Sequence, residues 1–191
     1  VIADLVGDNV GDCAGRGADL FESTAAENIG AMILGVALYP VFGIKGVLFP
    51  LVVRAFGLIA SIIGIMYTKL KNDNEDPMSA LNRGYYLTSV LAAVVFFIAV
   101  RWLLNGNLWF FFAGLVGIVT SVLIVLITVY YTDHKYKPVK DIAKASQTGH
   151  GTNIITGFAV GMESTAMPVI VLSAALIAAF WLGNSSGIPH G

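Results

Sequence analysis

Long apolar segments alternate with short polar segments along almost the whole chain. Each apolar run comes close to or exceeds the roughly 20 residues that a helix needs to cross a bilayer core. With their flanking turns included, the expected helices span about residues 4–40, 47–68, 85–104, 108–132 and 152–182. Almost none of these runs carries the polar face of a soluble surface helix. The pattern therefore predicts an all-α fold, a polytopic transmembrane helix bundle with about five spans in this chain.

The composition also indicates a membrane protein. Hydrophobic residues make up 57% of the 191 residues and charged residues 12%, against roughly 25% charged residues in soluble domains. Buried helices of a large soluble protein are the alternative, but five such runs in a chain of this length disfavour it. The chain opens on Val1 rather than methionine. We therefore expect residues 1–191 to be a single partial transmembrane domain of a longer protein.

Charge and cysteine content exclude several other classes. The formal net charge is −1, so no basic face is present to neutralise the phosphates of a nucleic acid. Cys13 is the single cysteine and has no disulfide partner within the chain. His134, His150 and His190 stand apart in polar stretches without the spacing of metal ligands.

Basic residues concentrate in two of the links between spans. Lys69, Lys71 and Arg83 surround the link after the second span, and four lysines follow the fourth span, at positions 135, 137, 140 and 144. Cytoplasmic links carry such an excess of Lys and Arg, so both are expected in the cytoplasm. Residues 133–146 are then an orientation signal, with phosphate contact by one lysine as the alternative. Residues 71–84, with Asp73, Glu75 and Asp76, have the composition of a solvated turn.

Five carboxylates precede or enter the first apolar run, and no lysine lies among residues 1–23. They are Asp4, Asp8, Asp12, Asp19 and Glu22. On a helix, a rotation of ~100° per residue places them at about 0, 40, 80, 60 and 0°, on one face roughly 27 Å long. Like charges there require protonation, water or bound cations. Carboxylate oxygens suit Mg²⁺ or Ca²⁺, and Mg²⁺ often shares its shell with a substrate phosphate. Metal-bound phosphate is therefore the leading ligand.

The two deeper acids have a different environment from the first three. Asp19 and Glu22 share a face near Leu20 and Phe21, where surroundings become apolar, and ionisable residues at such depth are usually functional. The alternative is a neutral hydrogen-bonded contact. Arg16 would neutralise part of their charge.

Glycines form a second stripe beside the acids. Gly7, Gly11 and Gly15 recur at the same four-residue step, and small residues let another helix approach closely. We expect this stripe to be a packing seam that holds the aspartates at fixed separations.

These motifs carry a family resemblance. The stretch VIADLVGDNVGDCAGRGADLFES, residues 1–23, resembles the membrane-integral, ion-pumping inorganic pyrophosphatases, whose hallmark is a repeated Asp-x-x-x-Asp-x-x-x-Asp with glycines followed by ADLFE. TGHGTNIITGFAVGMESTAMPV, residues 148–169, looks like a later link and span of that family. The resemblance implies a homodimer of about sixteen helices per subunit, of which this chain corresponds to roughly the sixth to tenth.

The resemblance also implies an activity and a role for each acid. The activity is Mg²⁺-dependent hydrolysis of inorganic pyrophosphate to phosphate, coupled to H⁺ and/or Na⁺ translocation across the membrane, with K⁺ and/or Na⁺ as candidate activators. Asp4, Asp8 and Asp12 would belong to the Mg²⁺ and pyrophosphate site, and Asp12, with an aspartate beyond this chain, would activate the attacking water. Asp19 would belong to the ion gate, and Glu22 to the transported-ion site.

Two positions refine what the resemblance implies. Glu22 stands where many bacterial sodium pumps and some bacterial proton pumps have their glutamate, whereas plant proton pumps have it at the position of Ala26. We therefore expect a multi-pass protein of a prokaryotic cell membrane, with the acidic site facing the cytoplasm. Arg16 occupies a position where the family often has methionine, which leaves the ion selectivity open. The chain alone is expected to be inactive, because most phosphate-binding lysines lie outside it.

A divalent-cation channel or exchanger with an acid-lined helix is the rival function. Lysines and further Asp-x-x-x-Asp motifs on other helices would separate the two, because pyrophosphate needs positive partners that a cation pathway avoids. Within the fifth span, Glu163 is expected to have a structural or coupling role rather than a role as a ligand, and Pro168 is expected to bend the helix.

Overall fold

The computed structural model describes residues 2–70 and 76–188. Throughout these two ranges the regular structure is helical and no strand is found. Five segments are long and apolar enough to cross a membrane. They are Ile2–Phe42, Ile44–Tyr67, Pro77–Leu103, Leu108–Thr148 and His150–Asn184. The predicted all-α fold with five spans is confirmed. Lys71, Asp73, Glu75 and His190, which the sequence singled out, lie outside the described residues.

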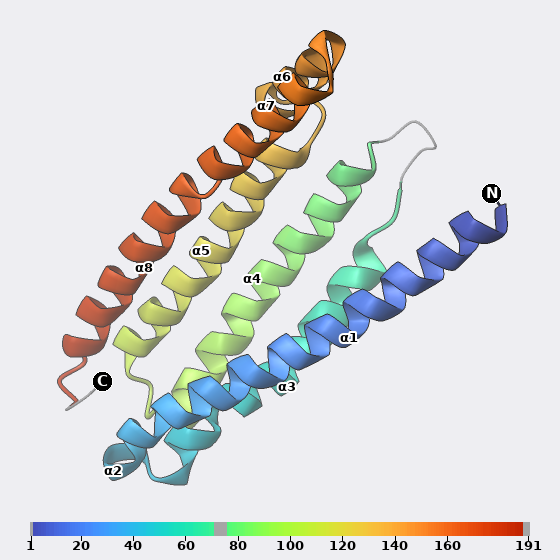
Figure 1. Ribbon diagram of the computed structural model, residues 1–191. Coiled ribbons are helices and arrows are strands. Elements are labelled where there is room, and N and C mark those ends of the chain that lie inside the picture. Colours follow the sequence, from blue (N-terminus) through green and yellow to red (C-terminus); the bar gives the residue numbers. More distant parts are fainter. Residues whose placement is uncertain (1, 71–75, 189–191) are drawn as a thin grey trace. The chain divides into compact units, whose positions relative to one another are not determined.

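The chain divides at the Gly106–Asn107 link into two compact units. The helices of the first unit are α1 (Ile2–Gly35), the short 3-10 turn η1 (Val36–Leu38), α2 (Tyr39–Phe42), α3 (Ile44–Tyr67) and α4 (Pro77–Leu103). Those of the second are α5 (Leu108–Thr132), α6 (Lys137–Ala145), the 3-10 turn η2 (Ser146–Thr148), α7 (His150–Glu163) and α8 (Ala166–Asn184). Figure 1 traces each unit in chain order.

The first span turns back into the second through a single glycine. Gly43 ends α2 and precedes α3 with φ of 60°, a conformation that residues with a Cβ rarely adopt. Its N–H donates to the Tyr39 carbonyl at 2.8 Å, which satisfies the end of α2. Beyond this turn α3 runs back along α1, and Gly35 of α1 lies against the Gly46 backbone of α3.

Helices α3 and α4 cross at two glycines. A Cβ at Gly64 would overlap the hydroxyl of Thr88, and a Cβ at Gly84 would overlap the hydroxyl of Thr68. Each hydroxyl also donates to the glycine carbonyl one turn earlier on its own helix, Thr68 to Gly64 and Thr88 to Gly84, both at 2.9 Å. The two helices therefore present the same small-residue arrangement to each other, the usual basis of close helix packing in membranes.

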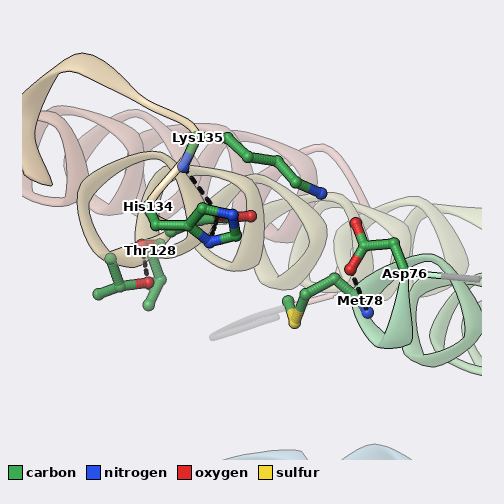
Figure 2. Close-up of polar contacts among 7 residues, drawn as sticks. Asp76, Met78, Thr128, His134 and Lys135 are labelled. Atoms are coloured by element: carbon green, nitrogen blue, oxygen red, sulfur yellow. Dashed lines mark hydrogen bonds and ion pairs between the residues drawn. The ribbon is translucent and has the colours of Figure 1, made fainter. Parts of the chain in front are cut away.

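Helix α4 begins earlier than the sequence pattern indicated. The Asp76 carboxylate accepts a hydrogen bond from the Met78 N–H at 3.1 Å, and Pro77 occupies the first turn (Figure 2). An aspartate cap followed by proline is a strong helix start. The prediction that residues 71–84 form a solvated turn is therefore wrong for 77–84, which are helical, and the span predicted at 85–104 extends back to Pro77.

The second unit is built on α5 lying beside α8. The rings of Trp109 and Trp181 meet edge to face with centroids 6.3 Å apart. At the same end the Asn107 side-chain amide donates to the Ser186 carbonyl at 3.2 Å, while its oxygen accepts from the Trp109 N–H at 3.1 Å. These contacts fasten the start of α5 to the end of α8.

The last span, in which Pro168 was expected to produce a bend, is interrupted shortly before this proline. Helix α7 ends at Glu163 and α8 begins at Ala166. Pro168 has no N–H for the carbonyl of Ser164 four residues earlier, and its ring crowds that carbonyl. The hydroxyl of Ser164 donates to the Gly161 carbonyl at 2.7 Å. Such side-chain hydrogen bonds satisfy backbone groups that a helix break would leave without partners in lipid.

The link between the fourth and fifth spans contains a helix that the sequence reading did not anticipate. Helix α6 is followed by η2 and by Gly149, which has φ of 132° and precedes α7. The nine residues of α6 are amphipathic. This pattern is too short to be recognised beside the long apolar runs on either side of it. The basic link is therefore ordered, and it packs on α7.

Few side chains are buried in the described residues: Pro138 of α6 in the second unit, and a small set of aliphatic side chains in the first unit. Those of the first unit are Ala60, Ala80, Ala99, Val100, Leu103 and Leu104. Large apolar side chains on every span are exposed instead. Apolar surface of this extent is covered by lipid or by other helices in a membrane protein.

The crossing of α3 and α4 predicts a specific stability change. Replacing Gly84→Ala forces a methyl group against Thr68, and overpacking of this kind costs about 1–3 kcal/mol. We expect a lower Tm for the purified protein in detergent. Thr68→Ala removes the obstructing hydroxyl, so the double variant Gly84→Ala/Thr68→Ala is expected to recover part of the loss. Strictly additive losses in thermal unfolding would contradict this packing.

Candidate functional site

Helix α1 holds the five predicted acids on one continuous helix. It runs without interruption from Ile2 to Gly35, so the helical spacing assumed for residues 4–27 is confirmed. Asp4 lies in its first turn, where a negative charge interacts favourably with the positive end of the helix dipole. The carboxylates therefore follow one another at fixed angular and axial steps.

The second half of α1 packs on α3, and the first half does not. Residues 2–23 are all exposed, and the half-buried positions of α1 begin at Thr24. From there the half-buried or buried residues recur with helical spacing, at Thr24, Ala25, Asn28, Ala31, Met32 and Gly35. This face lies roughly 160° around the helix from the acids. In Figure 1 the N-terminal part of α1 extends past α3.

Helix α3 therefore leaves the acidic face open. All five acids are exposed in this chain. A Cβ built at Gly7, Gly11 or Gly15 would meet no other atom within 4 Å among the described residues. The glycine stripe predicted as a packing seam thus has no partner helix within the described part of the chain, and the seam stays a prediction.

One arginine that the sequence reading passed over fixes α1 against α3. The Arg54 guanidinium, in the middle of α3, donates to the Thr24 hydroxyl at 2.8 Å, and the Asn28 amide donates to the Thr24 carbonyl at 2.8 Å. A charged residue within a span is rare and costly. The position of Arg54, alone in an apolar run, was therefore the feature of the sequence that could have identified it. The Arg54 contact joins α3 to the side of α1 that faces away from the acids.

A groove of about 280 Å³ marks the middle of the acidic face. Its walls are Gly11, Asp12, Gly15, Arg16 and Asp19. The two glycines lack the side chains that would fill it, which leaves the Asp12 carboxylate accessible along the helix. A side chain at either glycine position would occupy part of this space.

Arg16 contacts one of the two deeper acids. Its Nη1 lies 4.0 Å from Oδ2 of Asp19, and both side chains are exposed. An exposed pair of this kind contributes about 1 kcal/mol or less. The expectation that Arg16 neutralises part of the charge of the deeper acids agrees with this contact for Asp19.

The donor set fits a hard divalent cation, although one helix cannot complete its coordination. Asp4, Asp8 and Asp12 offer carboxylate oxygens, the ligands that Mg²⁺ prefers. Successive carboxylates one turn apart diverge from the helix axis, and no group of three His, Cys, Asp or Glu side chains within residues 2–70 and 76–188 is placed to hold a metal ion. Further ligands would have to come from another helix, a phosphate or water.

Glu163 lies in the second unit at the interruption of the last span. Its Oε1 accepts a hydrogen bond from the Tyr131 hydroxyl at 3.4 Å, and both residues line a cavity of about 600 Å³ with apolar neighbours. The contact links α5 to the end of α7. The structural or coupling role expected for Glu163 stays a prediction.

Comparison with known proteins gives a consistent result along the chain. A sequence profile described as inorganic H⁺ pyrophosphatase matches residues 1–189. The K⁺-insensitive pyrophosphate-energized proton pump 2 of Moorella thermoacetica is 62% identical over 100% of this chain and 28% of its own length. The pyrophosphate-energized membrane proton pump 3 of Arabidopsis thaliana is 55% identical over 98% of this chain and 25% of its own length.

A sodium pump is also among the relatives. The putative K⁺-stimulated pyrophosphate-energized sodium pump of Clostridium tetani is 44% identical over 100% of this chain and 28% of its own length. The chain thus spans about a quarter of the length of the relatives it matches. With an acidic helix, five membrane spans and a family match over residues 1–189, the chain belongs to the inorganic H⁺ pyrophosphatases, a family of multi-pass membrane proteins.

Proposed function

We propose that the protein carrying this chain hydrolyses inorganic pyrophosphate to phosphate and uses the reaction to move H⁺ and/or Na⁺ across the membrane. The observation that carries the proposal is the open acidic face of α1 in a chain whose relatives are named pyrophosphate-energized pumps. Five acids on one face of a helix that runs into an apolar span need a cationic or protonated environment. A metal-bound phosphate at one end and a transported ion at the other provide it.

Asp4, Asp8 and Asp12 are the proposed holders of Mg²⁺ and, through it, of pyrophosphate. Bound Mg²⁺ supplies charge neutralisation of the phosphate oxygens and orients the substrate. The Asp12 carboxylate accepts the proton of the attacking water as the new oxygen–phosphorus bond forms and the bridging phosphorus–oxygen bond breaks. Its position in the groove between Gly11 and Gly15 leaves room for that water.

Asp19 and Glu22 are the proposed ion-transport gate. They lie about two to three turns further along the same helix than Asp12, and Asp19 is within 4.0 Å of Arg16. Because α1 is continuous between the two sites, a displacement at Asp12 moves the gate acids with it. Such a shift would exchange an ion between the two sides of the membrane.

Several further features belong to this proposal. The protein is a homodimer in a prokaryotic cell membrane, with the acidic site in the cytoplasm, as the lysine-rich links favour. Residues 1–191 form one partial transmembrane domain that is inactive alone. The relatives include K⁺-insensitive and K⁺-stimulated pumps, so K⁺ and/or Na⁺ are candidate activators and H⁺ and/or Na⁺ the transported ion.

Loss of the water-activating carboxylate tests the hydrolysis. Asp12→Asn in the full-length protein is expected to lower Mg²⁺-dependent phosphate release from pyrophosphate by about 10²–10⁴-fold, because the amide cannot accept the proton. Phosphate release by membranes containing each variant measures this. Asp141→Asn, which removes the same charge from α6, is the matched control and is expected to retain activity.

Either of two results would argue against this site. Full turnover in Asp12→Asn would remove Asp12 from water activation. No phosphate release by the unmodified protein, with and without K⁺ and Na⁺, would instead favour the divalent-cation pathway, which flux measurements with Mg²⁺ and Ca²⁺ would then examine.

Loss of the deeper glutamate tests the coupling. Glu22→Ala is expected to abolish or alter ion transport into vesicles per phosphate released, while Asp4, Asp8 and Asp12 keep hydrolysis measurable. Glu27→Ala is the control, because Glu27 lies about 140° around α1 from Glu22. Vesicles of Glu22→Ala that pump as well as the unmodified protein would show that the role assigned to Glu22 is wrong.

A further inference from the structure

Helix α6 carries its charges on one side and its apolar side chains on the other. Lys137, Lys140 and Lys144 fall within about 60° of one another on a helix, and all three are exposed. On the opposite side Pro138 is buried and Ile142 half-buried, where α6 packs on α7. The structure thus turns three lysines outward in a single row.

The negative charges of the link neutralise this row only in part. The Asp133 carboxylate, whose side chain is 10% exposed, lies 3.0 Å from His134 Nδ1 and accepts the Lys135 N–H at 3.0 Å (Figure 2). It is therefore engaged in the turn before α6. Asp141, half-exposed, is the other acid of the link, and no ion pair joins it to a lysine within the described residues. A net positive row remains.

The position of α6 relative to the spans places this row near the membrane surface. It begins five residues after Thr132, where the apolar run of α5 ends, and it packs on α7, which enters the next span. At the end of α5 the rings of Tyr130 and Tyr131 are 5.0 Å apart, and those of Tyr130 and Tyr136 are 5.4 Å apart. Tyrosine clusters of this kind are enriched at the level of the lipid headgroups.

We propose that α6 lies along the cytoplasmic membrane surface and binds anionic phospholipid headgroups through Lys137, Lys140 and Lys144. Three ammonium groups in a row complement the phosphates of neighbouring lipids, and clusters of lysine next to a span are attracted to anionic leaflets. The apolar side of α6 is already covered by α7, so the contact is electrostatic rather than an insertion of the helix into the acyl chains. It does not depend on pyrophosphate hydrolysis.

Lipid binding by charge-altered variants tests this surface. Phosphatidylglycerol is titrated into the purified full-length protein in neutral detergent, and native mass spectrometry gives the ratio of lipid-bound to free protein, with phosphatidylcholine as the uncharged comparison. Each lysine near an anionic surface contributes roughly a fivefold gain in affinity. The triple variant K137Q/K140Q/K144Q is therefore expected to lose about a hundredfold in apparent affinity for phosphatidylglycerol.

Matched variants test whether the lipid affinity depends on the three lysines of α6, rather than on the total charge of the protein or on a folding defect. K137R/K140R/K144R keeps the charge and is expected to bind like the unmodified protein. K69Q, on the other lysine-bearing link, is expected to change little. The proposal would be overturned if the triple glutamine variant kept its affinity for phosphatidylglycerol. It would also be overturned if K69Q lost as much affinity as the triple variant. Displacement of the lipid by an equal concentration of inorganic phosphate would also overturn it, by identifying a small-anion site instead.

Discussion

A bilayer core offers no water to backbone N–H and C=O groups, and the rest of this structure depends on that constraint. Each span must satisfy its own hydrogen bonds, so the chain is helical wherever it is apolar. The consequence for α1 is geometric: once the helix is continuous, Asp4, Asp8 and Asp12 follow at one-turn steps along a rigid axis. The last span is interrupted at Ser164 and Thr165. There the two hydroxyl groups donate hydrogen bonds to the carbonyls of Gly161 and Met162.

Small residues decide how closely these helices approach. Lipid chains are as apolar as leucine, so helices gain most from close packing of backbones. Gly64 and Gly84 allow this between α3 and α4, and Gly35 allows it between α1 and α3. The remaining glycines of α1 meet no neighbour in the described part of the chain. Their stripe runs beside the open acids, which is where a further helix would have to approach to complete a metal site.

The charges of the chain are tolerated in three different ways. On α1 the acids share an open face and need cations or water. In α3 the charge of Arg54 is directed at the Thr24 hydroxyl, which ties it to the half of α1 that is packed. On α6 the lysines point outward from a surface helix. Acidic and basic faces thus lie on separate helices, and each face suits an oppositely charged ligand, a cation for α1 and a phosphate ester for α6.

The sequence by itself determined the five spans, the helical character of α1 and the shared face of its five acids, because helical periodicity and apolar length are local properties. It also located the interruption near Pro168, because proline acts on the turn that precedes it. The early start of α4 and the helix at α6 were missed, since a cap or nine amphipathic residues give a weak signal beside long apolar runs. Only the tertiary structure decided that α3 packs behind the acids, that Arg54 meets Thr24 and that Gly64 and Gly84 face each other. Each of these depends on which residues distant in the chain come together, and no local pattern specifies that.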